Sequence, residues 1–99
     1  AVTGVQTCAL PISAVHAMMN NLTKVFAEKQ ATVNAVAPGF VETDWQKDKP
    51  EQVRQNIYNK TAIHRFASVE EVVGAYAFCL DNGFVNGTVI EVNGGYSYM

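Results

Sequence analysis

The sequence predicts an α/β fold in which helices connect two parallel strands. Residues 32–36 form a near-continuous run of β-branched and small apolar residues, which is typical of a parallel strand covered on both faces. A second β-branched run extends from residue 88 to residue 92. Helical patterns lie before and between the two runs. Because such crossovers are right-handed in about 98% of known cases, we expect the two strands to be adjacent and parallel.

The first helix is predicted from Ser13 to about Ala27, because apolar residues recur there at spacings of three and four. Such a stripe is typical of a helix that covers a sheet. The positions on this face are Val15, Met18, Leu22 and Val25, widened by Met19 and Phe26.

The strand at 32–36 should end at Pro38-Gly39, a dipeptide that marks turns. The segment after Thr43 is polar apart from Trp45, and its composition is that of a solvated connector. Pro50 is well placed in the first turn of a short helix that runs to about Lys60.

Ser68-Val69-Glu70-Glu71 is a capping box, in which the Ser68 hydroxyl accepts from the Glu71 amide while the Glu71 carboxylate accepts from the cap amide. It predicts the start of a helix, and Asn82-Gly83 predicts a left-handed exit from it. Asn86-Gly87 predicts a turn before the last strand. The expected buried face of this helix consists of Val72, Val73, Tyr76, Cys79 and Leu80.

The length, charge and hydropathy of the chain argue against nucleic-acid-binding and membrane functions. A 99-residue chain buries only roughly 60 to 65% of its unfolded surface, so we expect a thin core. The net charge of −2 gives no basic stripe for nucleic acid or anionic lipid. No apolar run approaches the roughly 18 residues that span a bilayer, and no basic secretion signal begins the chain, so we expect no membrane partner and a cytoplasmic setting.

No metal site is expected. Cys8 and Cys79 lack a C-x-x-C spacing, and His16 and His64 are far apart in the sequence. Cys79 is interpreted as a small buried apolar residue on its helix.

Two motifs carry a resemblance to a known family. The segment T-V-N-A-V-A-P-G-F-V-E-T, residues 32–43, resembles the P-G-x-x-x-T segment of the short-chain dehydrogenase/reductase family. About fifty residues later, N-G-T-V-I-E-V-N-G-G, residues 86–95, resembles the last strand and closing Gly-Gly of that family. The resemblance implies the C-terminal portion of a Rossmann-like doubly wound parallel sheet, most similar to the 3-oxoacyl-acyl-carrier-protein reductase group.

The resemblance also implies a cofactor site, with Pro38 and Gly39 shaping the approach of a nicotinamide ring. The Val41 backbone would hydrogen-bond the carboxamide, and the Thr43 hydroxyl would lie near the carboxamide and phosphate. A glycine lets the main chain come close to a flat ring. The alternative is that Pro38-Gly39 only turns a strand into a loop.

Phe40, Trp45 and the helix at 50–60 would border the substrate by the same resemblance. The two aromatic side chains can equally supply local packing. The substrate itself is not identified by these residues beyond a small carbonyl or alcohol compound.

Residues 1–13 are expected to be foreign to the fold. Val2 to Ile12 matches, residue for residue, one translated frame of a common sequencing adapter. The alternative is a natural strand and turn that stops at Pro11. The family-like portion is then residues 14–99, and a match of the register at Ser13-Ala14-Val15 puts Ile12 and Cys8 at the family's catalytic lysine and tyrosine positions.

We therefore expect no catalytic residue in this chain, since Y-x-x-x-K and the glycine-rich dinucleotide turn are both missing. The resemblance implies that the full-length protein from which this portion comes would transfer hydride between NAD(P) and a carbonyl or alcohol, as a dimer or tetramer of identical subunits. This chain is expected to be inactive and to bind NAD(P) weakly or not at all. The alternative is a non-catalytic binding or subunit-interface module with the same half of the fold.

Overall fold

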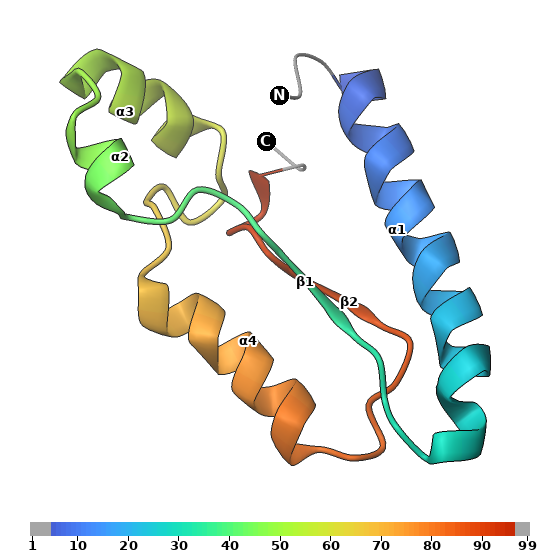
Figure 1. Ribbon diagram of the computed structural model, residues 1–99. Coiled ribbons are helices and arrows are strands. Elements are labelled where there is room, and N and C mark those ends of the chain that lie inside the picture. The colour runs from blue at the N-terminus through green and yellow to red at the C-terminus, as the bar shows by residue number, and fades with distance from the viewer. Residues whose placement is uncertain (1–4, 97–99) are drawn as a thin grey trace. The chain divides into compact units, whose positions relative to one another are not determined.

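The computed structural model describes the backbone of residues 5–96 and the side chains of residues 13–96 (Figure 1). A helix precedes the first strand, and helices connect this strand to the second, as the sequence predicts. The elements are α1 (Val5–Phe26), a 3-10 turn η1 (Ala27–Lys29), β1 (Ala35–Pro38), α2 (Asp44–Lys47), α3 (Glu51–Asn59), α4 (Val69–Asp81) and β2 (Val89–Val92).

Strands β1 and β2 form a two-stranded sheet. The amide of Gly87 donates to Val33 (2.8 Å), that of Ala35 to Thr88 (2.9 Å), and that of Gly39 to Val92 (2.9 Å). Because the paired positions increase together along both segments, the strands are parallel, and this prediction is confirmed. Figure 1 shows the two strands side by side.

The first strand is displaced toward the C-terminus of its predicted range. It begins at Ala35 and includes Pro38, whereas the sequence predicted residues 32–36 with an end before the proline. Side-chain hydrogen bonds replace the ladder at Asn34, whose amide donates to the Val85 carbonyl (3.0 Å) and whose carbonyl accepts from the Thr88 amide (3.2 Å). Pro38 is tolerated because the amides that donate toward β2 on either side of it belong to Ala35 and Gly39, so its missing N–H interrupts no bond between the two strands.

Helix α1 begins at Val5, not at Ser13, and Pro11 falls within it. The strand-and-turn alternative for this segment is therefore wrong from residue 5 onward. The segment α2 is a second departure, because the connector after Thr43 contains a helical turn that composition did not predict. Helix α3 agrees with prediction, with Pro50 at its N-cap and Lys60 at its C-cap.

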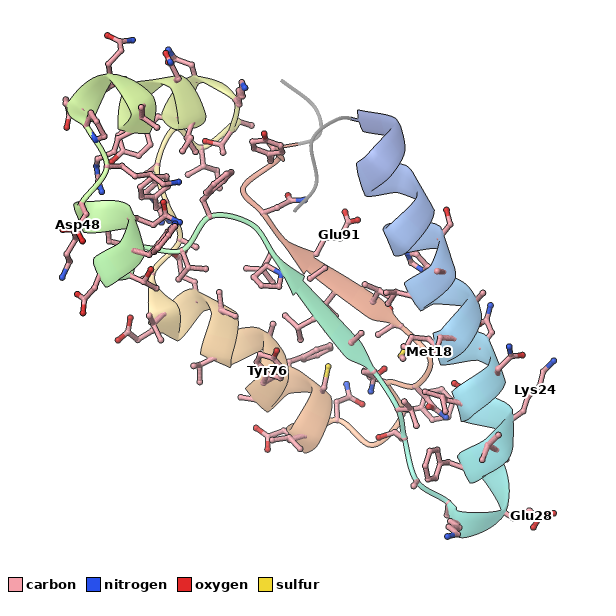
Figure 2. The ribbon with its side chains drawn as sticks, turned by 45° about the horizontal axis from the view of Figure 1, so that its top comes forward. Met18, Lys24, Glu28, Asp48, Tyr76 and Glu91 are labelled. Carbon is pink, nitrogen blue, oxygen red and sulfur yellow. The ribbon has the colours of Figure 1, made fainter. Side chains whose placement is uncertain are left out.

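The described residues divide into two compact units, 5–35 with 79–90 and 36–78 with 91–96. In the first unit, Met19 is the buried apolar side chain, at 4% exposure. Met18, labelled in Figure 2, is 49% exposed and Val25 is 67% exposed, so the predicted apolar face of the first helix is only partly buried. The Thr23 hydroxyl donates to the Met19 carbonyl (2.7 Å).

Phe66 is the buried apolar side chain of the second unit, at 5% exposure. The rings of Phe40 and Tyr58 lie 6.0 and 5.0 Å from it, centre to centre. Among the described side chains, only Met19 and Phe66 are buried and apolar, so the expected thin core is confirmed.

The capping box of α4 is confirmed. The Glu71 amide donates to the Ser68 hydroxyl (3.2 Å), and the Ser68 amide donates to the Glu71 carboxylate (2.8 Å). The left-handed exit at Gly83 is wrong, because Gly83 is not among the described residues with positive φ. Asn82 instead closes the turn with its own side chain, which accepts from the Phe84 amide (3.1 Å).

The predicted buried face of α4 is also wrong in part. Val72 and Cys79 are half-buried, whereas Val73 is 56%, Tyr76 (Figure 2) 52% and Leu80 84% exposed. The periodic pattern identifies the apolar side of a helix, but burial also requires a neighbouring element on that side.

Candidate functional site

The segment from Pro38 to Thr43 leaves the carboxyl end of β1, as the sequence predicts. Gly39 still belongs to the sheet, since its amide donates to the Val92 carbonyl (2.9 Å). A Cβ on Gly39 would stand 2.9 Å from the Asn93 Cα and 3.0 Å from the Asn93 Cβ. Glycine is therefore required here by the protein's own backbone, whether or not a ligand approaches this position.

Val41 and Ala67 form a parallel β-bridge. Its hydrogen bonds join Ala67 to the two neighbours of Val41, Phe40 and Glu42, and not to Val41 itself. The Ala67 amide donates to the Phe40 carbonyl (2.9 Å), and the Glu42 amide donates to the Ala67 carbonyl (2.8 Å). Among the described residues, neither the amide nor the carbonyl of Val41 has a hydrogen-bond partner. One donor and one acceptor on a single residue match the two polar atoms of a carboxamide.

Thr43 begins α2 without capping it by its side chain. Its backbone carbonyl accepts from the amides of Gln46 (3.0 Å) and Lys47 (3.2 Å). Its exposed hydroxyl makes no hydrogen bond to any residue that the structure describes. Val41 and Thr43 thus present three polar groups, two residues apart, for an outside partner.

Arg54 of α3 contacts this segment through Glu42, a link that the sequence analysis missed. The guanidinium binds both carboxylate oxygens of Glu42, at 3.2 and 2.9 Å. Hydrogen bonding to Glu42 raises the pKa of Arg54 above its usual value. The separation of twelve residues across a loop leaves no local sequence signal for this pair.

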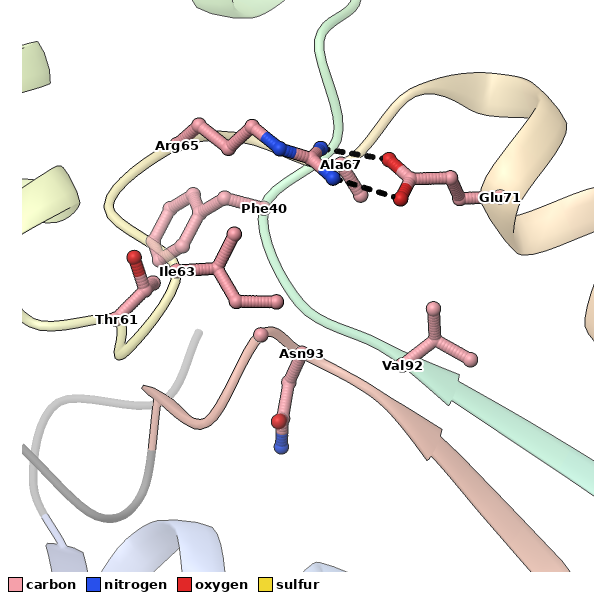
Figure 3. A pocket seen from close by; sticks show the side chains of 9 residues that line it. Phe40, Thr61, Ile63, Arg65, Ala67, Glu71, Val92 and Asn93 are labelled. Atoms are coloured by element: carbon pink, nitrogen blue, oxygen red, sulfur yellow. Dashed lines mark hydrogen bonds and ion pairs between the residues drawn. The ribbon is translucent and has the colours of Figure 1, made fainter.

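Phe40 lines a cavity of about 100 Å³ within the second unit (Figure 3). The ring of Tyr96 lies 5.7 Å from the Phe40 ring, and the Lys49 ammonium lies 5.1 Å from it, both measured to the ring centre. The remaining lining residues are Thr61, Ile63, Arg65, Ala67, Glu71, Val92, Asn93 and Gly94.

An ion pair between Arg65 and Glu71 borders the same cavity, as the dashed lines of Figure 3 show. The two oxygens of Glu71 lie 2.7 and 2.8 Å from the guanidinium. This hydrogen bonding, together with the bond from the Ser68 amide, lowers the pKa of Glu71 to about 2. The carboxylate therefore stays ionised and is a poor proton donor near neutral pH.

Trp45 does not line this cavity, and its side chain is 77% exposed on α2. The structure thus brings Phe40 to a hollow but leaves Trp45 on the surface. The substrate-side role expected for both aromatic residues stays a prediction.

The expected catalytic positions, Cys8 and Ile12, have side chains outside the described residues. Among the side chains from 13 to 96, no group of three His, Cys, Asp or Glu gathers where a metal ion would need them. Cys79 is half-buried on α4 and makes no disulfide. Within the described part of the chain, no helix is both long and apolar enough to cross a bilayer.

A family model described as Enoyl-(Acyl carrier protein) reductase matches residues 3–97. The 3-oxoacyl-[acyl-carrier-protein] reductase FabG of Aquifex aeolicus is 39% identical over 77 residues, which are 76% of this chain and 31% of that protein. The 3-oxoacyl-[acyl-carrier-protein] reductase of Homo sapiens is 43% identical over 75 residues, 75% of this chain and 30% of that protein. The chain spans about a third of the length of these curated relatives.

Solved structures give the same picture. A short-chain dehydrogenase/reductase from Serratia marcescens has a TM-score of 0.79 at 27% identity, with 95% of this chain and 39% of that chain covered. A 3-oxoacyl-[acyl-carrier protein] reductase from Brucella melitensis has a TM-score of 0.77 at 25% identity, with 85% of this chain and 32% of that chain covered.

Proposed function

The chain belongs to the short-chain dehydrogenase/reductase family, and from this we propose that it is the C-terminal portion of an NAD(P)-dependent reductase of 3-oxoacyl thioesters. A nicotinamide bound to the full-length protein would supply the hydride for the carbonyl carbon, and the family's catalytic tyrosine, which this chain lacks, would supply the proton for the carbonyl oxygen. Residues 38–43 would hold the nicotinamide end of the cofactor, through Pro38, Gly39, Val41 and Thr43. Phe40, and by resemblance Trp45, would border the substrate.

The observation that carries this proposal is the pair of unpartnered backbone groups on Val41 at the end of a parallel strand. Ligands of open α/β sheets bind outside the carboxyl ends of the strands. A carboxamide held by the Val41 amide and carbonyl is fixed in one orientation, and this orientation decides which ring face meets the substrate. The unpartnered hydroxyl of Thr43 adds a third polar contact for the same ligand.

The family description names an enoyl reductase, whereas the curated relatives quoted above are 3-oxoacyl reductases. We favour the carbonyl reaction because both of these relatives, at 39% and 43% identity to this chain, are 3-oxoacyl reductases. A direct comparison separates the reactions: the full-length protein should oxidise NADPH with a 3-oxoacyl thioester and not with a 2-enoyl thioester. Oxidation with the enoyl compound alone would contradict the proposed substrate.

The 99-residue chain itself is proposed to be inactive, because a tyrosine and lysine in Y-x-x-x-K are absent from it. Binding of NAD(P) should be weak or absent for the same chain, since no glycine-rich phosphate turn is present. The check is incubation of the purified chain with NADPH and a panel of 3-oxoacyl thioesters and ketones. Turnover above the buffer rate would contradict this part of the proposal.

A non-catalytic module is the competing function, and the coding sequence upstream of Ala14 distinguishes the two. A glycine-rich turn and Y-x-x-x-K upstream support the enzyme, with residues 1–13 as adapter-derived sequence. A native start codon near Ser13 supports the module. The full-length enzyme is proposed to act in the cytoplasm as a dimer or tetramer. Sedimentation of that protein measures its oligomeric state.

A further inference from the structure

The guanidinium of Arg54 is held from several sides within the second unit. It forms a two-pronged pair with Glu42 and is only 17% exposed. One nitrogen also donates to the Gln46 carbonyl of α2 (2.8 Å), and the other to the Tyr58 hydroxyl of α3 (2.8 Å). The ring of Phe66 lies 4.8 Å from its central carbon. A planar cation with these contacts has one position and orientation.

Glu42 lies between Val41 and Thr43, the two residues that present polar groups to a ligand. Its amide is bonded to the Ala67 carbonyl (2.8 Å), and its carboxylate is bonded to Arg54. Its backbone and its side chain are therefore both anchored. Because the peptide that joins Val41 to Glu42 contains the Val41 carbonyl, holding Glu42 also fixes the direction of that carbonyl.

We propose that Arg54 is a positioning residue, which holds Glu42 so that the backbone of Val41 presents its amide and carbonyl to the nicotinamide carboxamide. Arg54 touches neither the cofactor nor the substrate in this arrangement. Through Gln46 and Tyr58 it also connects the position of α2 and α3 to that of the cofactor-binding backbone. The inference rests on the proposed function for its ligand, but the clamp on Glu42 is testable without it.

The first test measures the clamp by amide hydrogen exchange in NMR of the 99-residue chain, at concentrations where the chain sediments as a monomer. Arg54→Met should speed exchange at the Glu42 and Ala67 amides about tenfold, the factor expected for the loss of a charge-assisted hydrogen bond. The Gly39 amide, which is bonded to Val92 and not to this cluster, should exchange at its original rate. Arg54→Lys should give an intermediate rate, since a lysine keeps the charge but not the fork.

Lys47→Met is the matched control, because it removes another cation from the same region. Among the described side chains, the ammonium of Lys47 pairs only with the exposed carboxylate of Asp44, at 3.6 Å. It should change none of these amides. Equal acceleration at Glu42, Ala67 and Gly39 in Arg54→Met would show a general loss of stability and overturn the proposal. Unchanged exchange at Glu42 and Ala67 would overturn it as well.

The second test uses the full-length reductase obtained by extending the coding sequence upstream. Arg54→Met should raise the KM for NADPH about tenfold and change kcat at saturating NADPH by less than about threefold, the split expected for a lost binding interaction. Lys47→Met should change neither. An unchanged KM in Arg54→Met overturns the positioning role, although the clamp itself stands if the exchange rates respond. If the unmutated full-length protein does not oxidise NADPH, the proposed function is contradicted. The exchange rates of the 99-residue chain then still test whether Arg54 holds Glu42.

Discussion

At Gly39 an added Cβ would stand 2.9 Å from the Cα of Asn93, closer than real Cβ atoms approach backbone. The backbone of Gly39 itself is ordinary, since it is not among the described residues with positive φ. Its need for glycine is therefore one of space and not of conformation. The sequence pattern Pro-Gly predicted the position of the turn, but not the neighbour that excludes a side chain.

Gly39→Ala should destabilise the chain by about 1–3 kcal/mol, the usual cost of forcing extra volume into a packed site. Chemical denaturation of the purified chain measures it. Gly83→Ala is the matched control, because nothing lies within 4 Å of the added Cβ. The control should change the free energy of unfolding by less than about 0.5 kcal/mol. Equal effects of the two substitutions would contradict the steric account of Gly39.

Residue-level prediction succeeded where the interaction was local. The capping box was read correctly because Ser68 and Glu71 are three residues apart and the motif states both hydrogen bonds. The ion pair of Arg65 with Glu71 and that of Arg54 with Glu42 were missed. Each depends on how a loop folds back, and charge pairs of this kind leave no periodic signal in the sequence.

Among the elements, α4 has a titratable start. Arg65 and the Ser68 amide keep the pKa of Glu71 at about 2, below its ordinary value of 4.5. A carboxylate with a lowered pKa stabilises the fold above its unfolded pKa, and this contribution disappears as the pH falls through the folded pKa. The start of α4 should therefore loosen as the pH falls from about 4.5 to about 2.

Amide exchange at the first turn of α4 checks this pH dependence. Protection at the Glu71 amide should fall over that interval. Glu71→Gln should remove most of the pH dependence, because the glutamine does not titrate. Glu70→Gln is the control, since the Glu70 carboxylate makes no ion pair or hydrogen bond with any described residue, and it should leave the profile unchanged. A flat profile in the unmutated chain would argue against the Arg65 contact.

Element boundaries were harder to predict than element types. Both strands were found and their parallel pairing was correct, because β-branched runs and a helical crossover restrict the topology strongly. The start of β1 moved to Ala35, since the side chain of Asn34 takes over hydrogen bonds that a ladder would make. The turn α2 was missed because its four residues are too few for a periodic pattern.

Many large apolar side chains of the described residues are exposed. Leu80 is 84% and Phe84 98% exposed, and Tyr76 and Val73 are each more than half exposed. Surfaces of this kind promote association in isolated domains. The sequence pattern overestimated the burial of α4, because an apolar face becomes buried only where a neighbouring element covers it.

We expect the purified 99-residue chain to bind a hydrophobic dye strongly and to sediment as larger species at higher concentration. Leu80→Ser combined with Phe84→Ser should lower the dye signal, because both side chains are already almost fully in contact with solvent. Asp81→Ser, a polar change in the same segment, should leave it unchanged. Dye binding as low as that of a compact native domain would contradict the exposed surface.

We propose that the backbone of Val41, which follows the carboxyl end of β1, holds the carboxamide of a nicotinamide cofactor. A crystal structure of the full-length protein with bound NAD(P)H tests this most directly. We expect the Val41 amide to donate to the carboxamide oxygen and the carboxamide nitrogen to donate to the Val41 carbonyl, each at about 2.9 Å. A carboxamide bound by other residues, with Val41 turned inward to protein partners, would contradict it.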